Sequence, residues 1–512
     1  MQHSNKEQRA PYGILAVLMI GAFIAFLNNT LLNIALPSIM KDLDVDASTV
    51  QWLSTGFMLV NGVLIPTTAF LIQKYSVRRL FILAMTLFSL GTILAGFAHT
   101  FPVLLAGRMI QASGSAVMMP LLMNVMLVSF PVEKRGTAMG FFGLIMMGAP
   151  AIGPTLSGYI IEHYDWRMLF HVITPISIAV LIAGMVMLKD KKEPSNARLD
   201  FLSVILSSLG FGGLLYGFSS AGSKGWDSPY VYGTLIIGVI AVAAFIIRQL
   251  KMEKPMLNFH IYRYPMFALS SAISMVVTMA MFSGMLLLPI YVQTIRGISP
   301  LDAGLMLLPG AILMAVMSPI NGKLFDKIGG KALALTGLAI TVITSYYFSQ
   351  LELDTTYTHL IWLYSLRMFG MSMVMMPVST NGLNQLPSRY YPHGTAMNNT
   401  MQQVSGAIGT ALLVTIMSNH TETRAKELAA DAMSTAAASG AAQPTAEAAA
   451  QMKQQIMMQA MVDGINYAFF ISVFIAGLAF VLALFIKRAT QAEDIISRTP
   501  AEKTVERQVV NE

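Results

Sequence analysis

The stretch RMIQASGSAVMMP runs from Arg108 to Pro120, and a similar stretch, RMFGMSMVMMP, runs from Arg367 to Pro377. A second pair has nearly the same spacing, because AFLIQKYSVRR begins at residue 69 and GKLFDKIGGKA begins at residue 322. The offsets are 259 and 253 residues, and the two pairs occur in the same order. Internal repeats of this kind are typical of secondary transporters that are built from two similar halves. The alternative, chance similarity in Met-rich apolar sequence, stays open.

Apolar segments of membrane-spanning length surround these repeats. The chain of 512 residues is 55% hydrophobic and 12% charged, whereas soluble domains carry about 25% charge. A helix needs about 20 apolar residues to cross the hydrocarbon of a bilayer, and irregular backbone cannot face lipid. We therefore expect an all-α integral membrane protein. The fourteen predicted spans are 12–36, 50–72, 80–99, 102–128, 137–160, 168–188, 200–220, 231–250, 266–291, 300–322, 332–350, 359–381, 394–418 and 464–486.

The basic residues favour one side of these spans. With alternating loops, 24 of the 33 Lys and Arg lie on one side and 7 on the other, with Arg108 and Arg367 inside the membrane. Basic loops face the cytoplasm, so both termini are predicted to be cytoplasmic. This placement argues against a nucleic-acid partner despite a net charge of +7. The chain has no Cys, which excludes disulfides and thiolate metal sites.

The repeat offset divides the chain into two halves and an insert. The expected parts are a tail (1–11), a six-helix half (12–188), a linker with two inserted helices (189–264), a second six-helix half (265–486) and a tail (487–512). The last outer segment, 420–463, is Ala-rich, with helical composition on both sides of a central break. It is predicted to be a helical hairpin over the outer mouth or a mobile low-complexity loop.

Five motifs follow one another in a regular order along the chain. They are NNTLLNIALP (28–37), GRMIQASGSA (107–116), APAIGPTLSG (149–158), DWRMLFHVITPI (165–176) and SPLDAGLMLLPGA (299–311). Together they resemble the fourteen-helix drug/proton antiporter family of the major facilitator superfamily, most closely its lincomycin-export type. The resemblance covers about residues 10–490. It implies the major facilitator fold, drug export in exchange for protons, and a bacterial plasma membrane; we expect a functional monomer.

Two of the departures from the family pattern are acidic residues that this chain lacks. The first-helix motif usually carries an Asp where this chain has Asn28, and the motif after the second helix usually has an Asp where it has Gln73. All 26 Asp and Glu lie at span ends, in loops or in tails. The residue that would carry the proton is therefore open. Border residues are the candidates: Asp302, Asp463 and His171, together with Asp42, Glu162 and Asp165.

The two intramembrane arginines are the first functional candidates. An Arg inside the membrane costs several kcal/mol unless it faces a partner or water. Gln111 lies three residues after Arg108, on the same helix face. The resemblance implies that Arg108 and Gln111 act in proton relay or gating, and the repeat extends this role to Arg367. The alternative is a structural Arg that is bonded to helix-end carbonyls.

Neutral polar side chains on the spans are candidates for a substrate cavity. Such groups either bind a substrate near the midplane or join helices to one another, and both interpretations stay open. Flexible, polarizable Met side chains suit a promiscuous site. The cavity candidates are Asn28, Asn29, Asn33, Asn61, Asn124, Met371, Asn398, Asn399, Gln402 and Gln403.

Glycine, proline and one acidic residue are candidates for conformational control. The run 148–158 puts bare backbone on one helix, which predicts a sealed pivot between the halves or ordinary close packing. Asp326 lies in a tight loop motif and can accept from a helix N-terminus or from an Arg across the halves. It is predicted to be a latch or a simple capped turn. The conformational candidates are Gly148, Gly153, Pro154, Gly158, Gly322, Asp326 and Gly329.

The predicted function is secondary-active multidrug export by alternating access, driven by protons. The cargo would be amphipathic or cationic drugs and lincosamides. No GxxxxGK[ST] motif occurs, so ATP hydrolysis is not expected, and neither an enzyme activity nor a cofactor is predicted. The eight His show no metal-ligand spacing. Two alternatives stay open: export of an endogenous lipid, nucleotide or peptide-like metabolite, and a transport-inactive sensor or scaffold.

Overall fold

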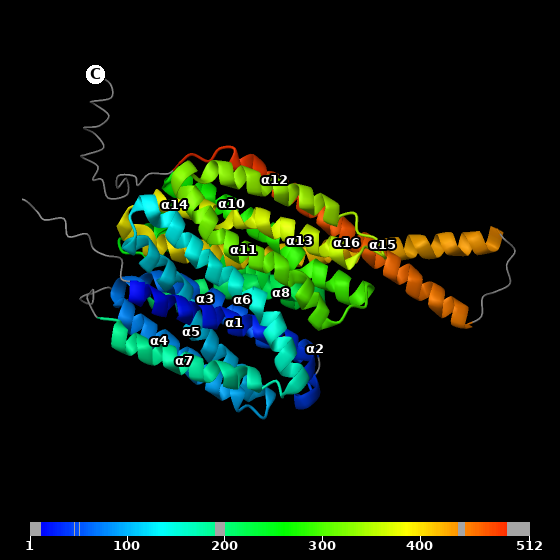
Figure 1. Ribbon diagram of the computed structural model, residues 1–512, viewed down its shortest axis with the longest axis horizontal. Coiled ribbons are helices and arrows are strands. Elements are labelled where there is room, and N and C mark those ends of the chain that lie inside the picture. Colours follow the sequence, from blue (N-terminus) through cyan, green and yellow to red (C-terminus); the bar gives the residue numbers. More distant parts are fainter. Residues whose placement is uncertain (1–11, 46, 51, 190–199, 439–445, 489–512) are drawn as a thin grey trace, which may run out of the picture.

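The computed structural model describes residues 12–45, 47–50, 52–189, 200–438 and 446–488, and its regular elements there are all helical (Figure 1). The all-helical prediction is confirmed. Twelve described helices are long and apolar enough to cross a membrane, judged by length and composition. The helices are α1 (Tyr12–Leu43), α2 (Ala47–Val50), α3 (Trp52–Lys74), α4 (Val77–Gly96), α5 (Phe101–Ser129), α6 (Arg135–His163), α7 (Met168–Met187), α8 (Phe201–Lys224), α9 (Pro229–Lys251), α10 (Pro265–Ile290), α11 (Pro300–Ile328), α12 (Gly330–Phe348), α13 (Tyr357–Ser372), α14 (Met375–Asn384), α15 (Tyr391–Ala438) and α16 (Ala446–Ala483).

Helix boundaries follow local capping chemistry. The Ser76 hydroxyl accepts from the backbone N–H of Arg79 at the start of α4, and Ser299 accepts from Asp302 at the start of α11. Gly329 ends α11 with φ of +83°, a left-handed conformation that favours glycine. A break at Met373 and Val374 separates α13 from α14 within one long apolar segment.

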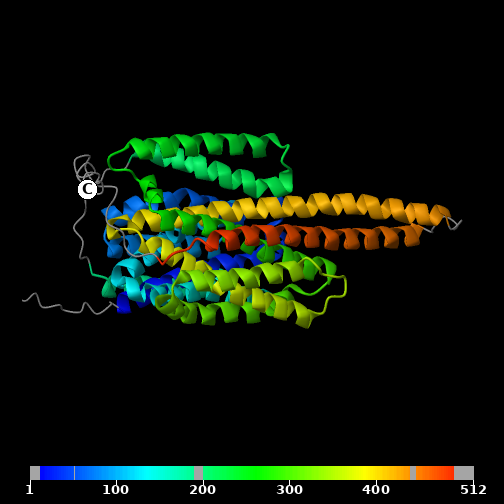
Figure 2. The same cartoon turned by 90° about the horizontal axis from the view of Figure 1, so that it is seen from above.

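The helices form two packed groups with a separate pair at one side. Helices α1 and α3–α7 pack on one another, as do α10–α16. The green pair α8 and α9 lies along one side of the bundle in Figure 2 and packs against α3 and α15. The contact between the two groups includes a long seam of α6 against α11 and a second seam of α3 against α15. Any functional site between the groups is bounded by these seams.

The two ends of the bundle differ. At one end, which we call the basic end, α1 begins and α16 stops (Figure 2). Helix α3 ends with Lys74, and Lys134 lies in the short turn between α5 and α6. At the opposite end, α15 and α16 continue beyond the other helices as a projecting pair (Figure 1). The described part of 420–463 is therefore helical up to Ala438 and again from Ala446, and residues 439–445 lie outside the described residues.

Candidate functional site

Arg108 is completely buried in the first helix group. Its Nη1 donates to Oε1 of Gln111 at 2.6 Å, and its Nη2 donates to Oδ1 of Asn29 at 3.2 Å. The Gln111 amide in turn donates to the Thr92 hydroxyl at 2.8 Å. The guanidinium lies 4.3 Å from the centre of the Phe57 ring, a cation–π contact. These side chains, which we call the Arg108 cluster, come from α1, α3, α4 and α5.

The partners of Arg108 in this cluster are neutral. Its Nε is buried without a hydrogen-bond partner. Among the described residues, the buried charged side chains are Arg108, Arg135 and Arg367, and no Asp or Glu is among them. A buried cation without a counter-charge is costly. The energy of such a cation changes strongly when an anion binds or a proton moves nearby, because charges interact more strongly in surroundings of low dielectric constant. Asn29 is partly exposed, whereas Arg108 and Gln111 are completely buried.

Arg367 has different surroundings. Its guanidinium donates to the Ser345 hydroxyl at 2.8 Å and to the backbone carbonyl of Ala280 at 2.7 Å. The rings of Phe348 and Phe469 lie 5.8 and 5.9 Å from it. Sequence analysis left open that such an arginine has only a structural role, bonded to backbone carbonyls. The bond of Arg367 to the Ala280 carbonyl and its contacts with two rings favour this alternative. The repeat therefore preserves the residue but not the pattern of partners around it.

The border residues Asp302, Asp463 and His171, which sequence analysis considered as proton carriers, have partners outside the Arg108 cluster. The Asp302 carboxylate accepts from Ser299 at 2.7 Å and caps α11. Asp463 pairs with Arg424 at 3.0 Å at the base of the projecting pair. His171 packs its ring edge-on against Phe97 at 5.0 Å. Each of these groups has a local partner within its own helix group.

Asp42, another border residue, is held in the charged form at the end of α1. It accepts from the Trp166 ring N–H at 3.1 Å and lies 2.9 Å from Nη1 of Arg167. The Trp166 hydrogen bond, followed by the contact with Arg167, lowers the pKa of the Asp42 carboxyl below its usual range. A carboxyl that is stabilised as the anion is poorly suited to take up a proton near neutral pH.

The predicted cavity residues divide into several environments. Asn398 donates to the Ser379 hydroxyl at 2.8 Å, which joins two helices of the second group. Asn399 donates to the Thr395 carbonyl at 2.8 Å and lies 3.9 Å from the sulfur of Met123 in the other group. Met371 is completely buried in an apolar cluster with residues of α10 and α12, and its role in a cavity stays a prediction. Of the other predicted cavity residues, Asn28, Asn61 and Asn124 are buried, whereas Gln402 and Gln403 are partly exposed.

Gln402 lines a small cavity within the second helix group. Ser274 and Thr278 of α10 and Met375 of α14 also line it. Its volume is about 10 Å³, which is room for about one water molecule. This cavity is too small for a drug. The side chains of Asn33 and Pro154, two further predicted residues, lie outside what the structure describes.

The seam between α6 and α11 is a close backbone contact at the basic end. A Cβ at Gly322 would lie 2.2 Å from the carbonyl oxygen of Gly136, and one at Gly140 would lie 2.6 Å from that of Ser318. Glycine is therefore needed for the approach of the two backbones. Gly322, the last residue of the predicted span 300–322, lies inside α11 because this helix continues to Ile328, and it faces the other helix group.

Asp326 crosses the same seam. Its two carboxylate oxygens accept from the backbone N–H groups of Gly136 and Thr137, each at 2.8 Å, and from the Thr137 hydroxyl at 2.6 Å. These N–H groups are the unpaired donors in the first turn of α6, so the anion also meets the positive end of that helix. Of the two partners that sequence analysis left open for this carboxylate, the structure shows the helix N-terminus. Gly136 and Thr137 carry no motif signal of their own, and sequence reasoning missed them.

The predicted pivot residues on α6 contact both groups. A Cβ at Gly153 would lie 2.2 Å from the Thr30 hydroxyl of α1, whereas one at Gly158 would lie 3.2 Å from Leu301 of α11. A Cβ at Gly148 would meet only Phe23, at an ordinary 3.7 Å. Gly153 therefore packs within the first group, and Gly158 packs between the groups at the end opposite the basic end.

Asp326→Asn is expected to weaken the seam at the basic end. The substitution keeps the shape but removes the charge that meets the α6 terminus, which is worth about 1 kcal/mol and corresponds to about a fivefold larger open population. Since the chain has no Cys, Ser318→Cys provides a single buried reporter in the seam. Its rate of labelling by a maleimide is expected to rise about fivefold.

Asp302→Asn is the matched control for this experiment, because Asp302 caps the other end of the same helix through Ser299 and makes no contact across the seam. Its labelling rate should match that of the unsubstituted reporter protein. Equal rates for Asp326→Asn and the reporter protein would show that the carboxylate does not hold the seam closed.

The family of the chain is shown by comparison with known proteins. Residues 18–410 match the Major Facilitator Superfamily. The chain belongs to this superfamily and is therefore a multi-pass membrane transporter, which confirms the resemblance drawn from its motifs.

Two relatives come from Bacillus subtilis (strain 168). An uncharacterized MFS-type transporter, YhcA, is 52% identical over 84% of this chain and 81% of its own length. The lincomycin resistance protein LmrB is 44% identical over 79% of this chain and 85% of its own length. Among solved structures, the human organic anion transporter MFSD10 (TETRAN) superposes with a TM-score of 0.64. That alignment has 14% identity and covers 93% of this chain and 100% of that one, and it shows a shared fold alone.

Proposed function

We propose that this transporter is a secondary-active exporter of amphipathic drugs, lincosamides among them, which works by alternating access in exchange for protons. The names of its relatives support drug efflux, since LmrB is a lincomycin resistance protein and EmrY of Escherichia coli is a probable multidrug resistance protein at 26% identity. The observation that carries the mechanism is the seam at the basic end, where Asp326 joins the two helix groups through the start of α6.

The proposed topology has fourteen spans. Helices α6 and α10, of 29 and 26 residues, add to the twelve that meet the length and hydropathy of a span. In this topology α1–α7 and α10–α16 are the two six-helix halves, and α8 and α9 are an insert. The basic end faces the cytoplasm because basic loops are retained there, and the projecting pair of α15 and α16 faces outward. The transporter is proposed to work as a monomer.

Alternating access requires that the contacts at the basic end break and re-form in each cycle. Besides the Asp326 contact, Arg135 bridges the halves by donating to Asn384 at 3.4 Å and lying 4.8 Å from the Tyr391 ring. All of these interactions are weak individually, at about 1 kcal/mol each. A small differential in binding energy from the cargo or the proton is therefore enough to shift the two populations.

The charge of the interior bears on the cargo. The buried charged groups of the described residues are three arginines. A permanent cation that enters this region meets their repulsion without a carboxylate to offset it. We therefore propose that neutral amphiphiles, and amines that can cross as neutral molecules, are the better cargo within the predicted range of amphipathic and cationic drugs. We propose that Asn29, Asn399 and Gln403 orient the cargo through hydrogen bonds, and the contact of Asn399 with Met123 of the other group supports this for Asn399.

The function is tested by efflux from proteoliposomes with an imposed pH gradient, using a lincosamide and a permanently cationic dye. Gradient-driven lincosamide efflux is expected to exceed dye efflux by about tenfold or more, since one unpaired charge in a low-dielectric site costs more than about 1.4 kcal/mol. Asn29→Asp, which places a carboxylate against Arg108, should pair that arginine and raise the pH dependence of the rate. Lincosamide efflux that ignores the gradient would contradict proton exchange.

A further inference from the structure

The sequence repeat pairs Gln73 with Asp326, since the two residues stand at equivalent positions with an offset of 253. Asp326 contacts the start of α6, and Gln73 makes the corresponding contact with the start of α15. Its amide nitrogen lies 2.7 Å from Nε2 of His393. The second seam, between α3 and α15, thus has a latch of its own at the basic end, and this latch is neutral.

A third segment contacts this latch. We call residues 252–264, which join α9 to α10, the connector. The backbone N–H of Asn258 in the connector donates to Nδ1 of His393 at 3.2 Å, and the His393 side chain is buried. One imidazole ring therefore has Gln73 of the first half on one side and the connector of the insert on the other.

The two contacts depend on each other through the ring proton. A neutral imidazole has one donor and one acceptor nitrogen. The Asn258 N–H can donate only to an unprotonated Nδ1, so this contact favours the tautomer with the proton on Nε2, which faces Gln73. The Gln73 amide can present its oxygen there, since the two orientations of an amide have the same shape. Loss of the Asn258 contact would release this tautomer and weaken the hydrogen bond across the halves.

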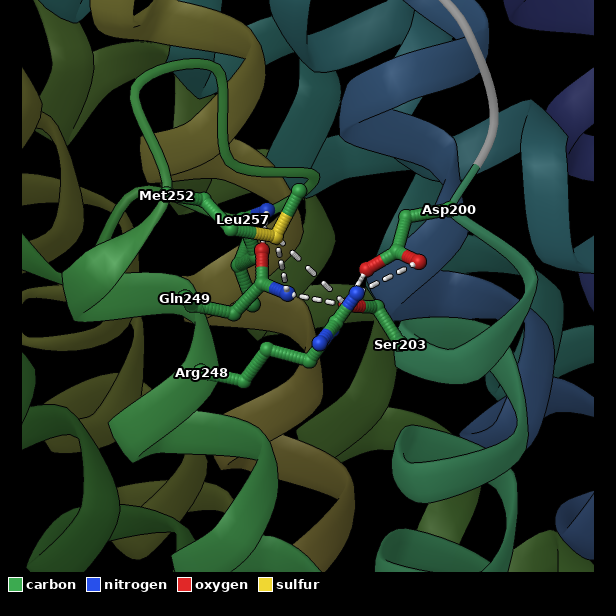
Figure 3. Close-up of polar contacts among 6 residues, drawn as sticks. All are labelled: Asp200, Ser203, Arg248, Gln249, Met252 and Leu257. Atoms are coloured by element: carbon green, nitrogen blue, oxygen red, sulfur yellow. Dashed lines mark hydrogen bonds and ion pairs between the residues drawn. The ribbon is translucent and has the colours of Figure 1, made fainter.

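The connector is attached firmly to the insert. Figure 3 shows Gln249 of α9 between the two, accepting from the Leu257 N–H at 3.1 Å and donating to Ser203 of α8 at 2.5 Å. Beside it, the Arg248 guanidinium donates to both carboxylate oxygens of Asp200 at 2.7 and 3.0 Å. These hydrogen bonds join α8, α9 and the connector to one another at this end.

The insert also contacts both halves nearer its other end. The rings of Trp52 in α3 and Tyr216 in α8 stack with centres 5.7 Å apart. The ring N–H of Trp226, in the turn after α8, donates to the hydroxyl of Thr415 in α15 at 2.6 Å. The insert therefore touches both helices of the second seam, α3 and α15, and the connector touches it again through His393.

We infer that the insert is a clamp across the α3–α15 seam, with His393 as the positioning residue through which the connector holds the basic end closed. The inference rests on the proposed alternating access. It assigns the two extra helices a regulatory role: any change that pulls the connector from His393 favours opening of the basic end, without a contact to the cargo.

The clamp is tested with spin labels on the full-length protein, reconstituted in nanodiscs. Because the chain lacks Cys, Glu133→Cys and Ser388→Cys label one exposed site in each half at the basic end. Asn258→Pro removes the N–H that bonds to His393 and suits the backbone there, where φ is −84°. The fraction of long, open distances measured by pulsed electron resonance should rise about two- to tenfold.

Asn258→Ala is the matched control. Both substitutions delete the side-chain oxygen that accepts from the His260 N–H, but only proline deletes the backbone donor. Asn258→Ala should leave the distances unchanged, and His393→Ala should reproduce the effect of Asn258→Pro. Unchanged distances in both Asn258→Pro and His393→Ala would overturn the clamp. The distances are measured without drug or gradient, so this result is independent of whether the protein exports lincosamides.

Discussion

Arg108→Ala is expected to abolish drug export while the amount of protein in the membrane stays within about twofold of the unsubstituted level. Arg108 is the only charged member of a cluster that joins Asn29, Phe57 and Gln111 from three helices. Removing the guanidinium deletes both a cation–π contact and two charge-assisted hydrogen bonds. It also removes the field that a moving proton would sense. The helices stay packed through the apolar core around the cluster, which includes Phe88, Leu104 and Met118.

Efflux of a lincosamide from loaded cells, with immunoblots of the membrane fraction, measures both quantities. Ser113→Ala is a control on the same helix, since the Ser113 hydroxyl bonds only to the carbonyl of Met109, within α5. It should retain normal export. Arg108→Lys, which keeps the charge but not the planar fork, should retain a small part of the rate. Normal export by Arg108→Ala at normal abundance would reduce this arginine to a structural role.

Gly322→Ala is expected to lower export to about one-tenth or less. The added methyl group would lie 2.2 Å from the carbonyl oxygen of Gly136, well inside van der Waals contact. The two backbones must therefore separate, at a cost of about 1–3 kcal/mol, whenever the basic end closes. The open state has no such clash, so the population shifts toward it by about five- to 150-fold. The cycle then stalls with the basic end open.

Gly148→Ala is the matched control, because it makes the same change on α6, where the new methyl group would meet only a ring carbon of Phe23 at 3.7 Å. It should export normally. Uptake of drug into everted vesicles compares the two variants at equal abundance. If Gly322→Ala transports as well as Gly148→Ala, the seam does not close as tightly during the cycle as the structure shows.

Most of the helices were predictable from the sequence, and the reason is local. The predicted span 137–160 lies within α6, which covers 135–163, and the predicted span 266–291 corresponds to α10 at 265–290. Hydropathy decides these segments, since about 20 apolar residues can satisfy their backbone in a membrane only as a helix. The break between α13 and α14 lies inside the predicted span 359–381. It falls at Met373 and Val374, two apolar residues that give no signal of a helix end.

The partners of the polar residues were not predictable in the same way. The first-helix motif directed attention to Asn28, but Asn29 is the residue that meets Arg108, 79 positions along the chain. A rotation of one residue along a helix, about 100°, decides between the two. That rotation depends on how α1 packs against its neighbours, which no local pattern specifies.

Sequence alone determined the class of this protein: the motifs, the apolar spans and the distribution of charge predict an all-helical membrane transporter, and the match to the Major Facilitator Superfamily confirms that class. Tertiary structure decided how its parts control one another. Asp326 reaches α6 across 190 residues and Gln73 reaches His393 across 320. Hydrophobicity is additive along the chain and can be read from it, whereas a hydrogen bond needs two atoms within about 3 Å. Only the packing of whole helices brings such atoms together.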